Sequence, residues 1–174
     1  IFLPMYIVGN NIFVLFDFLL WFILLLCAAE TKKDLMIRKE YLNQINNSQF
    51  SKLDEQTILN QLPNLNIYEF YQEVFDIYKE VQIAWMDNDI ERVRNILGDE
   101  LFNTYKMQLE TLKVKNQKNM MEDIKLVDVY ITSIRKQDNK EIIDIIMKVT
   151  CRDYLIDINT SKVLRGNKNK VWNY

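Results

Sequence analysis

Residues 143–152 read IDIIMKVTCR, and every second side chain in this stretch is apolar. A β-strand points successive side chains to opposite faces, so this alternation predicts a strand with one buried face and one more polar face. The apolar set is Ile143, Ile145, Met147, Val149 and Cys151, and the polar set is Asp144, Lys148, Thr150 and Arg152.

Further strands are predicted on both sides of this one. Asp138-Asn139 indicates a hairpin turn that joins it to an earlier strand. Residues 159–162 indicate a second turn and residues 166–169 a third, before a final strand at residues 171–174. The result is an antiparallel meander. In the earlier strand, strict alternation would put Val127, Val129 and Ile131 on one face, and Leu126, Tyr130 and Ile134 on the other.

Three helices are predicted before the first strand. Residues 67–85 carry apolar side chains at spacings of three and four, which is typical of an amphipathic helix. Asp89 is expected to cap a short helix from Ile90 to Leu97, which ends at Gly98. A third helix is expected from Asp99 to about Lys113. Helices followed by antiparallel strands predict an α+β fold in which three helices pack on the sheet.

The predicted α+β domain spans residues 67–174 and follows a membrane anchor. Residues 12–29 contain only one polar side chain, Asp17. At about 1.5 Å per residue, a helix of this length comes close to the roughly 30 Å thickness of a bilayer's hydrocarbon core. We therefore expect a transmembrane helix at residues 12–29 and a juxtamembrane helix and linker at residues 30–66.

Basic residues follow the anchor and none precedes it. By the positive-inside rule, this asymmetry places the C-terminal domain in the cytoplasm, with a single pass of this chain through the cell membrane. The same side chains could also attract anionic lipid. These membrane-proximal basic residues are Lys32, Lys33, Arg38 and Lys39.

The composition argues against several classes of function. The chain has 22 basic and 24 acidic residues and a net charge of −2, whereas nucleic-acid-binding domains usually carry a basic excess. It has no histidine, which removes the most common general base and the most common zinc ligand. Cys27 and Cys151 are read as free thiols. We expect no nucleic acid partner, no metal, no cofactor and no enzymatic activity.

Two stretches carry motifs that point to a family. The first is residues 81–89, VQIAWMDND, followed by Arg94, Leu97 and residues 100–102; the second is residues 153–157, DYLID, with Thr160, residues 162–164, Gly166 and Trp172. Together they resemble the Tim44-like domain family, over about residues 69–174. That family is named for a mitochondrial inner-membrane translocase subunit that tethers the protein-import motor, and it includes bacterial membrane proteins. Ser161 stands where the family's turn has glycine.

The resemblance implies a cone similar to nuclear transport factor two, in which a curved antiparallel sheet wraps helices around a large apolar pocket. It implies no catalytic residues, and roles in protein translocation or membrane-lipid association. The predicted anchor favours the bacterial branch.

We expect the pocket to bind lipid or an apolar peptide segment, which makes the chain a membrane-anchored binding or scaffolding module of a membrane-protein complex. For Trp85, core packing is favoured over a role in stacking on the ligand. The predicted lining is Trp85, Tyr105, Leu109, Tyr130 and Met147.

Four questions remain open. A proton-transfer enzyme on the same scaffold would use Asp153 or Tyr130 as acid or base. Asp153 and Asp157 could form a carboxylate pair, although turn and surface roles are favoured. A structural subunit would fill the pocket with its own side chains. The basic stretch Lys113 to Lys118 is either a solvated loop or a contact for lipid headgroups.

Overall fold

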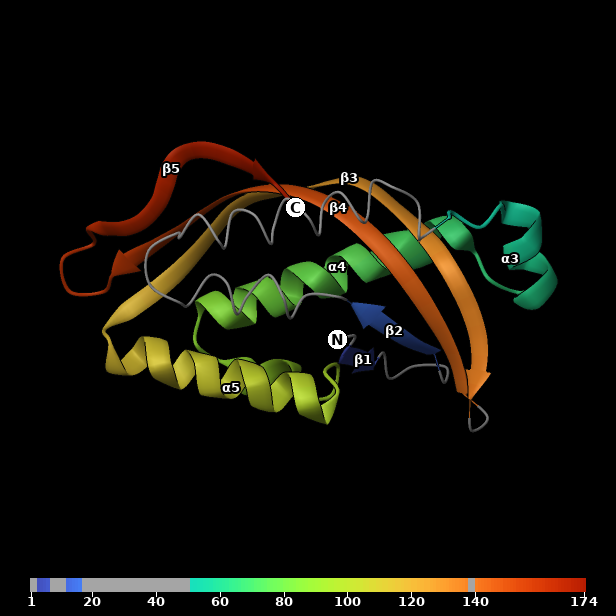
Figure 1. Cartoon of the computed structure of the whole chain (residues 1–174), viewed down its shortest axis with the longest axis horizontal. Coiled ribbons are helices and arrows are strands. Elements are labelled where there is room, and N and C mark those ends of the chain that lie inside the picture. The colour runs from blue at the N-terminus through green and yellow to red at the C-terminus, as the bar shows by residue number, and fades with distance from the viewer. Residues whose placement is uncertain (1–2, 7–11, 17–50, 138–139) are drawn as a thin grey trace.

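A computed structural model describes residues 3–6, 12–16, 51–137 and 140–174. Long strands arch over two long helices in the α+β arrangement that the sequence predicts (Figure 1). The helices are α3 (Glu55–Gln61), α4 (Ile67–Met86), the 3₁₀ turn η1 (Ile90–Val93) and α5 (Asp99–Val114), and the long strands are β3 (Gln117–Gln137), β4 (Lys140–Asp157) and β5 (Val163–Asn173).

Strand β4 is the centre of the sheet. β3 runs antiparallel along one edge, from the pair Gln117 and Asp157 to the pair Gln137 and Lys140. β5 runs antiparallel along the second half of the other edge. The predicted meander is therefore confirmed, except that residues 166–174 continue β5 instead of starting a further strand. Opposite Asp153, residues 167–170 bulge away from β4.

Strand β3 does not alternate strictly. At three places it has one more residue than the facing part of β4, which makes a β-bulge and bends the strand. The second bulge lies between Leu126 and Asp128 and leaves Val127 61% exposed. Val129 and Ile131 thus share a face as predicted, whereas the predicted faces of Val127, Leu126 and Ile134 were wrong. Leu126, Val129, Ile131 and Ile134 are the residues that face the helices, opposite Val149, Met147, Ile145 and Ile143 of β4.

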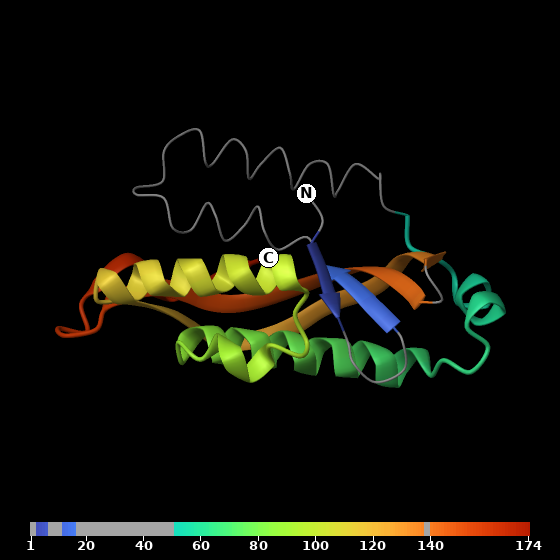
Figure 2. The same ribbon diagram turned by 90° about the horizontal axis from the view of Figure 1, so that it is seen from below.

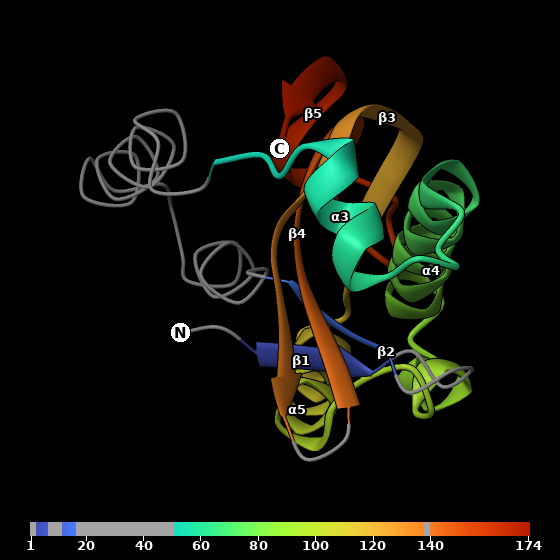
Figure 3. The same ribbon diagram turned by 90° about the vertical axis from the view of Figure 1, so that its right-hand side faces the viewer.

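The two long helices cover the concave side of the arch, with α4 beside β3 and β4 (Figures 2 and 3). Asn66 caps α4, because its side chain accepts a hydrogen bond from the backbone N–H of Glu69. Both helices agree with their predictions to within one residue of the expected ends. Their apolar faces supply most of the buried core.

The predicted helix at residues 90–97 forms only in part, and its type and length differ from the prediction. Only the 3₁₀ turn η1 forms, and the Asp89 side chain makes no capping hydrogen bond. Ile90, Val93 and Leu97 are buried, so the segment is shaped by packing and not by helix propensity. Gly98 begins α5 as its N-cap instead of ending an earlier helix.

Helix α3 lies inside the segment that the sequence predicts to be a linker. Asp54 caps it by accepting hydrogen bonds from the Thr57 backbone N–H and hydroxyl, and Ile58 is 2% exposed. One cap and one buried side chain stabilise this short helix. The first long strand also begins earlier than its alternating apolar residues indicate, because β3 already starts at Gln117.

The predicted transmembrane segment lies mostly outside the described residues. Its first five residues form strand β2 (Ile12–Phe16), which pairs in parallel with residues 141–144 of β4 and antiparallel with β1 (Leu3–Tyr6). The helix therefore does not begin at Ile12, since β-branched and aromatic residues at this position pair with a free strand edge. The described residues contain no helix with the length and apolar character needed to cross a membrane. The anchor stays a prediction.

Candidate functional site

Three of the five predicted pocket residues lie together in the main core. Trp85 of α4 and Tyr105 of α5 meet edge to face, with ring centroids 5.1 Å apart. Leu109, one turn after Tyr105, belongs to the same cluster, and all three are at most 5% exposed. These side chains therefore belong to one packed cluster of the core.

The other two predicted pocket residues lie on opposite faces of the sheet. Met147 faces the helices and is half-buried, and it packs against the main core and also against a second cluster formed by Phe75, Tyr78 and Val149. Tyr130 pairs with Ile146 on the outer face, where the Lys148 ammonium lies 5.9 Å from its ring. The structure therefore brings Met147 to the other three and separates Tyr130 from them.

A buried carboxylate lies next to the second cluster. Asp153 is 5% exposed, and its Oδ2 accepts a hydrogen bond of 2.6 Å from the hydroxyl of Tyr174. Burial, with a smaller contribution from the charge of Asp153, raises the pKa of the Cys151 thiol to about 12. Burial also raises the pKa of Tyr78 well above its usual value. Both groups are therefore neutral at physiological pH.

Three buried carboxamides add polar atoms to the helix-facing side. Gln82 of α4, Gln108 of α5 and Asn119 of β3 are each at most 7% exposed. Among the described residues, Gln82 Oε1, Gln108 Oε1 and Asn119 Nδ2 find no hydrogen-bond partner. Buried amide groups normally have one, so these atoms can hydrogen-bond to a water molecule or to a polar group of a ligand.

The sequence reasoning missed these carboxamides. Gln82 follows Tyr78 by one helical turn, and Gln108 follows Tyr105 by three residues, so each is a polar residue on a buried helix face. A glutamine at helical spacing from a buried aromatic residue was the sequence feature that could have identified them. On β3, Met121 donates its backbone N–H to Met86 Sδ at 3.0 Å, which ties the end of α4 to the sheet beside Asn119.

Asp153 and Asp157 do not act as a carboxylate pair. Asp157 accepts hydrogen bonds from the Thr160 backbone N–H and hydroxyl at 2.8 and 2.9 Å, and these bonds lower its pKa. It stabilises the turn after β4, which confirms its predicted turn role. Asp153 is instead buried, so a surface role is wrong for that residue.

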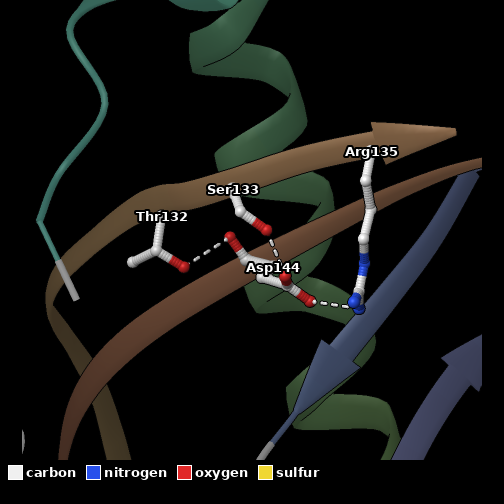
Figure 4. A network of polar contacts seen from close by, with 4 residues as sticks. All are labelled: Thr132, Ser133, Arg135 and Asp144. Carbon is white, nitrogen blue, oxygen red and sulfur yellow. Dashed lines mark hydrogen bonds and ion pairs between the residues drawn. The ribbon is translucent and has the colours of Figure 1, made fainter. Parts of the chain in front are cut away.

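The outer face carries a polar cluster around Asp144. Its carboxylate accepts hydrogen bonds from the Ser133 hydroxyl and from the Arg135 guanidinium, and its backbone carbonyl accepts one from the Thr132 hydroxyl (Figure 4). Thr132 is the extra residue of the third bulge of β3. The cluster thus holds a bend of the sheet, and its polar groups satisfy one another.

Other predicted sites remain untested. The basic residues after the anchor, Lys32, Lys33, Arg38 and Lys39, lie outside the described residues. No group of three or more metal-ligating side chains occurs within residues 51–137 and 140–174.

The sequence model of the Tim44-like domain matches residues 55–173. The chain belongs to the Tim44-like domain family. A search of curated proteins found no match. The matched region of this Tim44-like domain begins at α3, so it includes the short helix that sequence reasoning treated as linker.

One feature of the Tim44-like domain's final turn explains the family pattern. Ser161 adopts a φ of 56°, which is favourable for glycine and unfavourable for a residue with a β-carbon. Its backbone N–H donates to the Asp157 carbonyl at 2.8 Å. The turn therefore keeps a glycine-type conformation even though this chain has serine there.

Proposed function

We propose that this Tim44-like domain is a non-enzymatic binding or scaffolding module that works at a membrane in protein transport. The observation that carries the proposal is the family match, which covers the whole helical layer and the long strands. The predicted anchor at residues 12–29 and the basic residues after it would hold the domain on the cytoplasmic side of the cell membrane.

We infer that the ligand is a lipid or an apolar polypeptide segment that enters between the helices and the sheet in a cone of the nuclear transport factor two type. Two observations support this. Met147 is half-buried between the two core clusters, where a ligand could replace its solvent contact. The unpartnered atoms of Gln82, Gln108 and Asn119 could bind the polar end of such a ligand.

Native mass spectrometry of the detergent-extracted full chain tests the binding. The wild type should carry an additional lipid or peptide mass. Met147→Trp, which places a larger side chain between the two clusters, should lose that mass. Tyr130→Trp is the matched control on the outer face and should keep it. A wild-type chain without any bound mass, or equal retention in both variants, would contradict the inference.

Photo-crosslinking tests the role in transport. A benzophenone amino acid replaces Met107, which is 66% exposed on α5, in the full chain in its own membrane. A precursor is arrested in transit by a tightly folded passenger domain. An adduct of the chain with that precursor, which disappears when the passenger unfolds and transport resumes, is the expected result. Absence of the adduct, together with unchanged transport after depletion of the chain, would exclude this role.

A proton-transfer enzyme is the second candidate, and the burial of Asp153 favours it. A carboxylate that is 95% buried and bonded to a phenol is the type of group that such enzymes use. Asp153→Asn should then keep the co-purified ligand but stop its conversion. The turn variant Asp157→Asn is the control and should change neither the binding of the ligand nor its conversion. If Asp153→Asn changes only stability, the non-enzymatic proposal stands.

A further inference from the structure

The basic stretch at the C-terminal end of α5 lies beside the turn between β4 and β5, which is far from it in the sequence. The turn between β4 and β5 lies at the same end of the molecule as the C-terminal end of α5 (Figures 1 and 2). The Ile158 backbone N–H donates to the Asn116 carbonyl at 2.9 Å, which holds the two segments together. We name residues 113–118 and 158–162 the basic tip.

The basic tip is strongly cationic compared with the rest of the chain. It contains four lysines and no acidic residue, although the whole chain has a net charge of −2. None of the four forms an ion pair with a described residue. The adjoining carboxylate of Asp157 stays ionised, because hydrogen bonds from Thr160 lower its pKa, so it offsets only one of the four positive charges. The lysines are Lys113, Lys115, Lys118 and Lys162.

Two aliphatic side chains stand exposed between these lysines. Val114 is 81% exposed and Ile158 is 52% exposed. A single exposed aliphatic residue needs no explanation, but two on adjoining segments, flanked by unpaired lysines, match the combination that binds membrane surfaces. Lysines are attracted by anionic headgroups, and aliphatic side chains enter the boundary between headgroups and acyl chains.

We propose that the basic tip docks on the anionic surface of a lipid bilayer and inserts Val114 and Ile158 into its interface. This inference rests on the proposed membrane location of the domain. An acidic polypeptide would meet the same lysines but would leave both aliphatic side chains without an apolar environment. A bilayer satisfies both features.

The test uses the full chain in proteoliposomes and a solvatochromic dye on an introduced cysteine. Val114→Cys reports on the basic tip, and Tyr68→Cys is the control. Tyr68 is 77% exposed and is the second residue of α4, which begins at the opposite end of the molecule (Figure 1). Both are made with Cys27→Ser, and Cys151 is fully buried and does not label. The vesicles contain phosphatidylcholine alone or with added phosphatidylglycerol.

The emission of the dye at residue 114 should shift to shorter wavelength only in the anionic vesicles. The emission of the dye at residue 68 should not shift in either type of vesicle. Lys113→Gln with Lys115→Gln should lower the ratio of docked to undocked tip about fivefold per lysine, and added salt should act in the same direction. The control pair, Lys52→Gln with Lys125→Gln, makes the same change in net charge away from the tip and should leave the ratio unchanged.

Three results would overturn the proposal. The first is the same emission wavelength at residue 114 in both types of vesicle, and the second is an equal shift of the dye at residue 68. The third is a shift at residue 114 that occurs in neutral vesicles only after polyglutamate is added. The last would identify an acidic polypeptide as the partner. The crosslink at Met107 does not require lipid contact, so a tip that does not dock leaves the transport role standing, and a failed crosslink counts against the proposed transport role alone.

Discussion

Strands β4 and β3 lie side by side and line the same core, yet only one of them alternates regularly. In β4, every second residue from Ile143 to Leu155 faces the helices without interruption. In β3, three extra residues interrupt the same arrangement. A regular strand can be assigned from its sequence alone, whereas a bulged strand is assigned only when its partner is known.

The bulges give the sheet its curvature. Each extra residue bends β3, and α4 lies on the concave side of the curved sheet (Figure 1). Asp123 in the first bulge has a φ of 54°, and Arg152 holds it through an ion pair of 2.8 Å. The strand with the irregular sequence therefore determines the shape, and the regular strand provides the face on which the core packs.

Deletion of one residue should have the largest effect on stability, and the effect should be much larger in β4 than in β3. Without Lys148, one half of β4 would turn its apolar side chains outward, so we expect loss of cooperative unfolding. Without Val127, Leu126 and Asp128 keep their partners and only a bulge is lost, at a cost of roughly 1–3 kcal/mol. Denaturant unfolding followed by circular dichroism measures both. Equal damage would refute the assigned bulge.

Truncation of adjacent isoleucines measures the two faces of β4. Ile145 is 6% exposed in the core, so Ile145→Ala should cost about 2–5 kcal/mol. Ile146 lies on the outer face and is half-buried, so Ile146→Ala should cost about 1 kcal/mol. Equal values in denaturant unfolding would show that the outer face is covered as well as the inner one.

The hydrogen bond to Asp153 should matter less than a core side chain. Tyr174→Phe removes the phenol that donates to the buried carboxylate, so we expect a loss of about 1–3 kcal/mol. Tyr68→Phe is the control, because Tyr68 is 77% exposed and should show no change. If Tyr174→Phe unfolds at the wild-type denaturant concentration, the bond does not contribute to stability.

Alkaline pH should weaken the fold through Cys151, Tyr78 and Tyr105. Burial raises the pKa of each, that of Cys151 from 9.0 to about 12. Between the two values the folded state holds a proton that the unfolded state releases, so stability falls as pH rises above about 9, by at most about 1.4 kcal/mol per pH unit per group. Cys151→Val should reduce that slope between pH 9 and 10, measured by denaturant unfolding. An unchanged slope would exclude a contribution from the thiol.

The smallest expected effect is at Ser161. Ser161→Gly relieves the unfavourable backbone conformation at a φ of 56° but makes the unfolded chain more flexible, so the net gain should be about 0.5–1 kcal/mol. Ser161→Ala keeps a β-carbon and should not stabilise. If thermal unfolding shows no gain for glycine, the turn is not strained.

The sequence was sufficient for the features that depend on local periodicity. The spacing from Ile67 to Trp85 predicted α4, and the alternation after Ile143 predicted β4. It was not sufficient for α3, η1 or the carboxamides, because each depends on a neighbour far along the chain. Ile58 stabilises α3 only by packing into the shared core, and Gln82 is buried only because the sheet covers it.

The residues of the candidate site also fall into those that the sequence predicted and those that required the structure. Trp85, Tyr105 and Leu109 lie on predicted apolar helix faces, and the structure places them together. Tyr130 was predicted to line the pocket but lies on the outer face of the sheet. The sequence did not show this, because the bulges of β3 are recognised only from its pairing with β4. The burial of Asp153 also depends on strand pairing, since Tyr174 reaches it through the contact of β5 with β4.

By itself, the sequence determined the α+β class, the family, and the identity of the helices and strands whose side chains repeat with a regular period. Only the tertiary structure decided the curvature of the sheet, the face on which each β3 residue lies, and the union of two distant segments in the basic tip. The physical reason is that periodicity depends on residues close together in the sequence, whereas bulges, burial and surface patches depend on contacts between residues far apart in the chain.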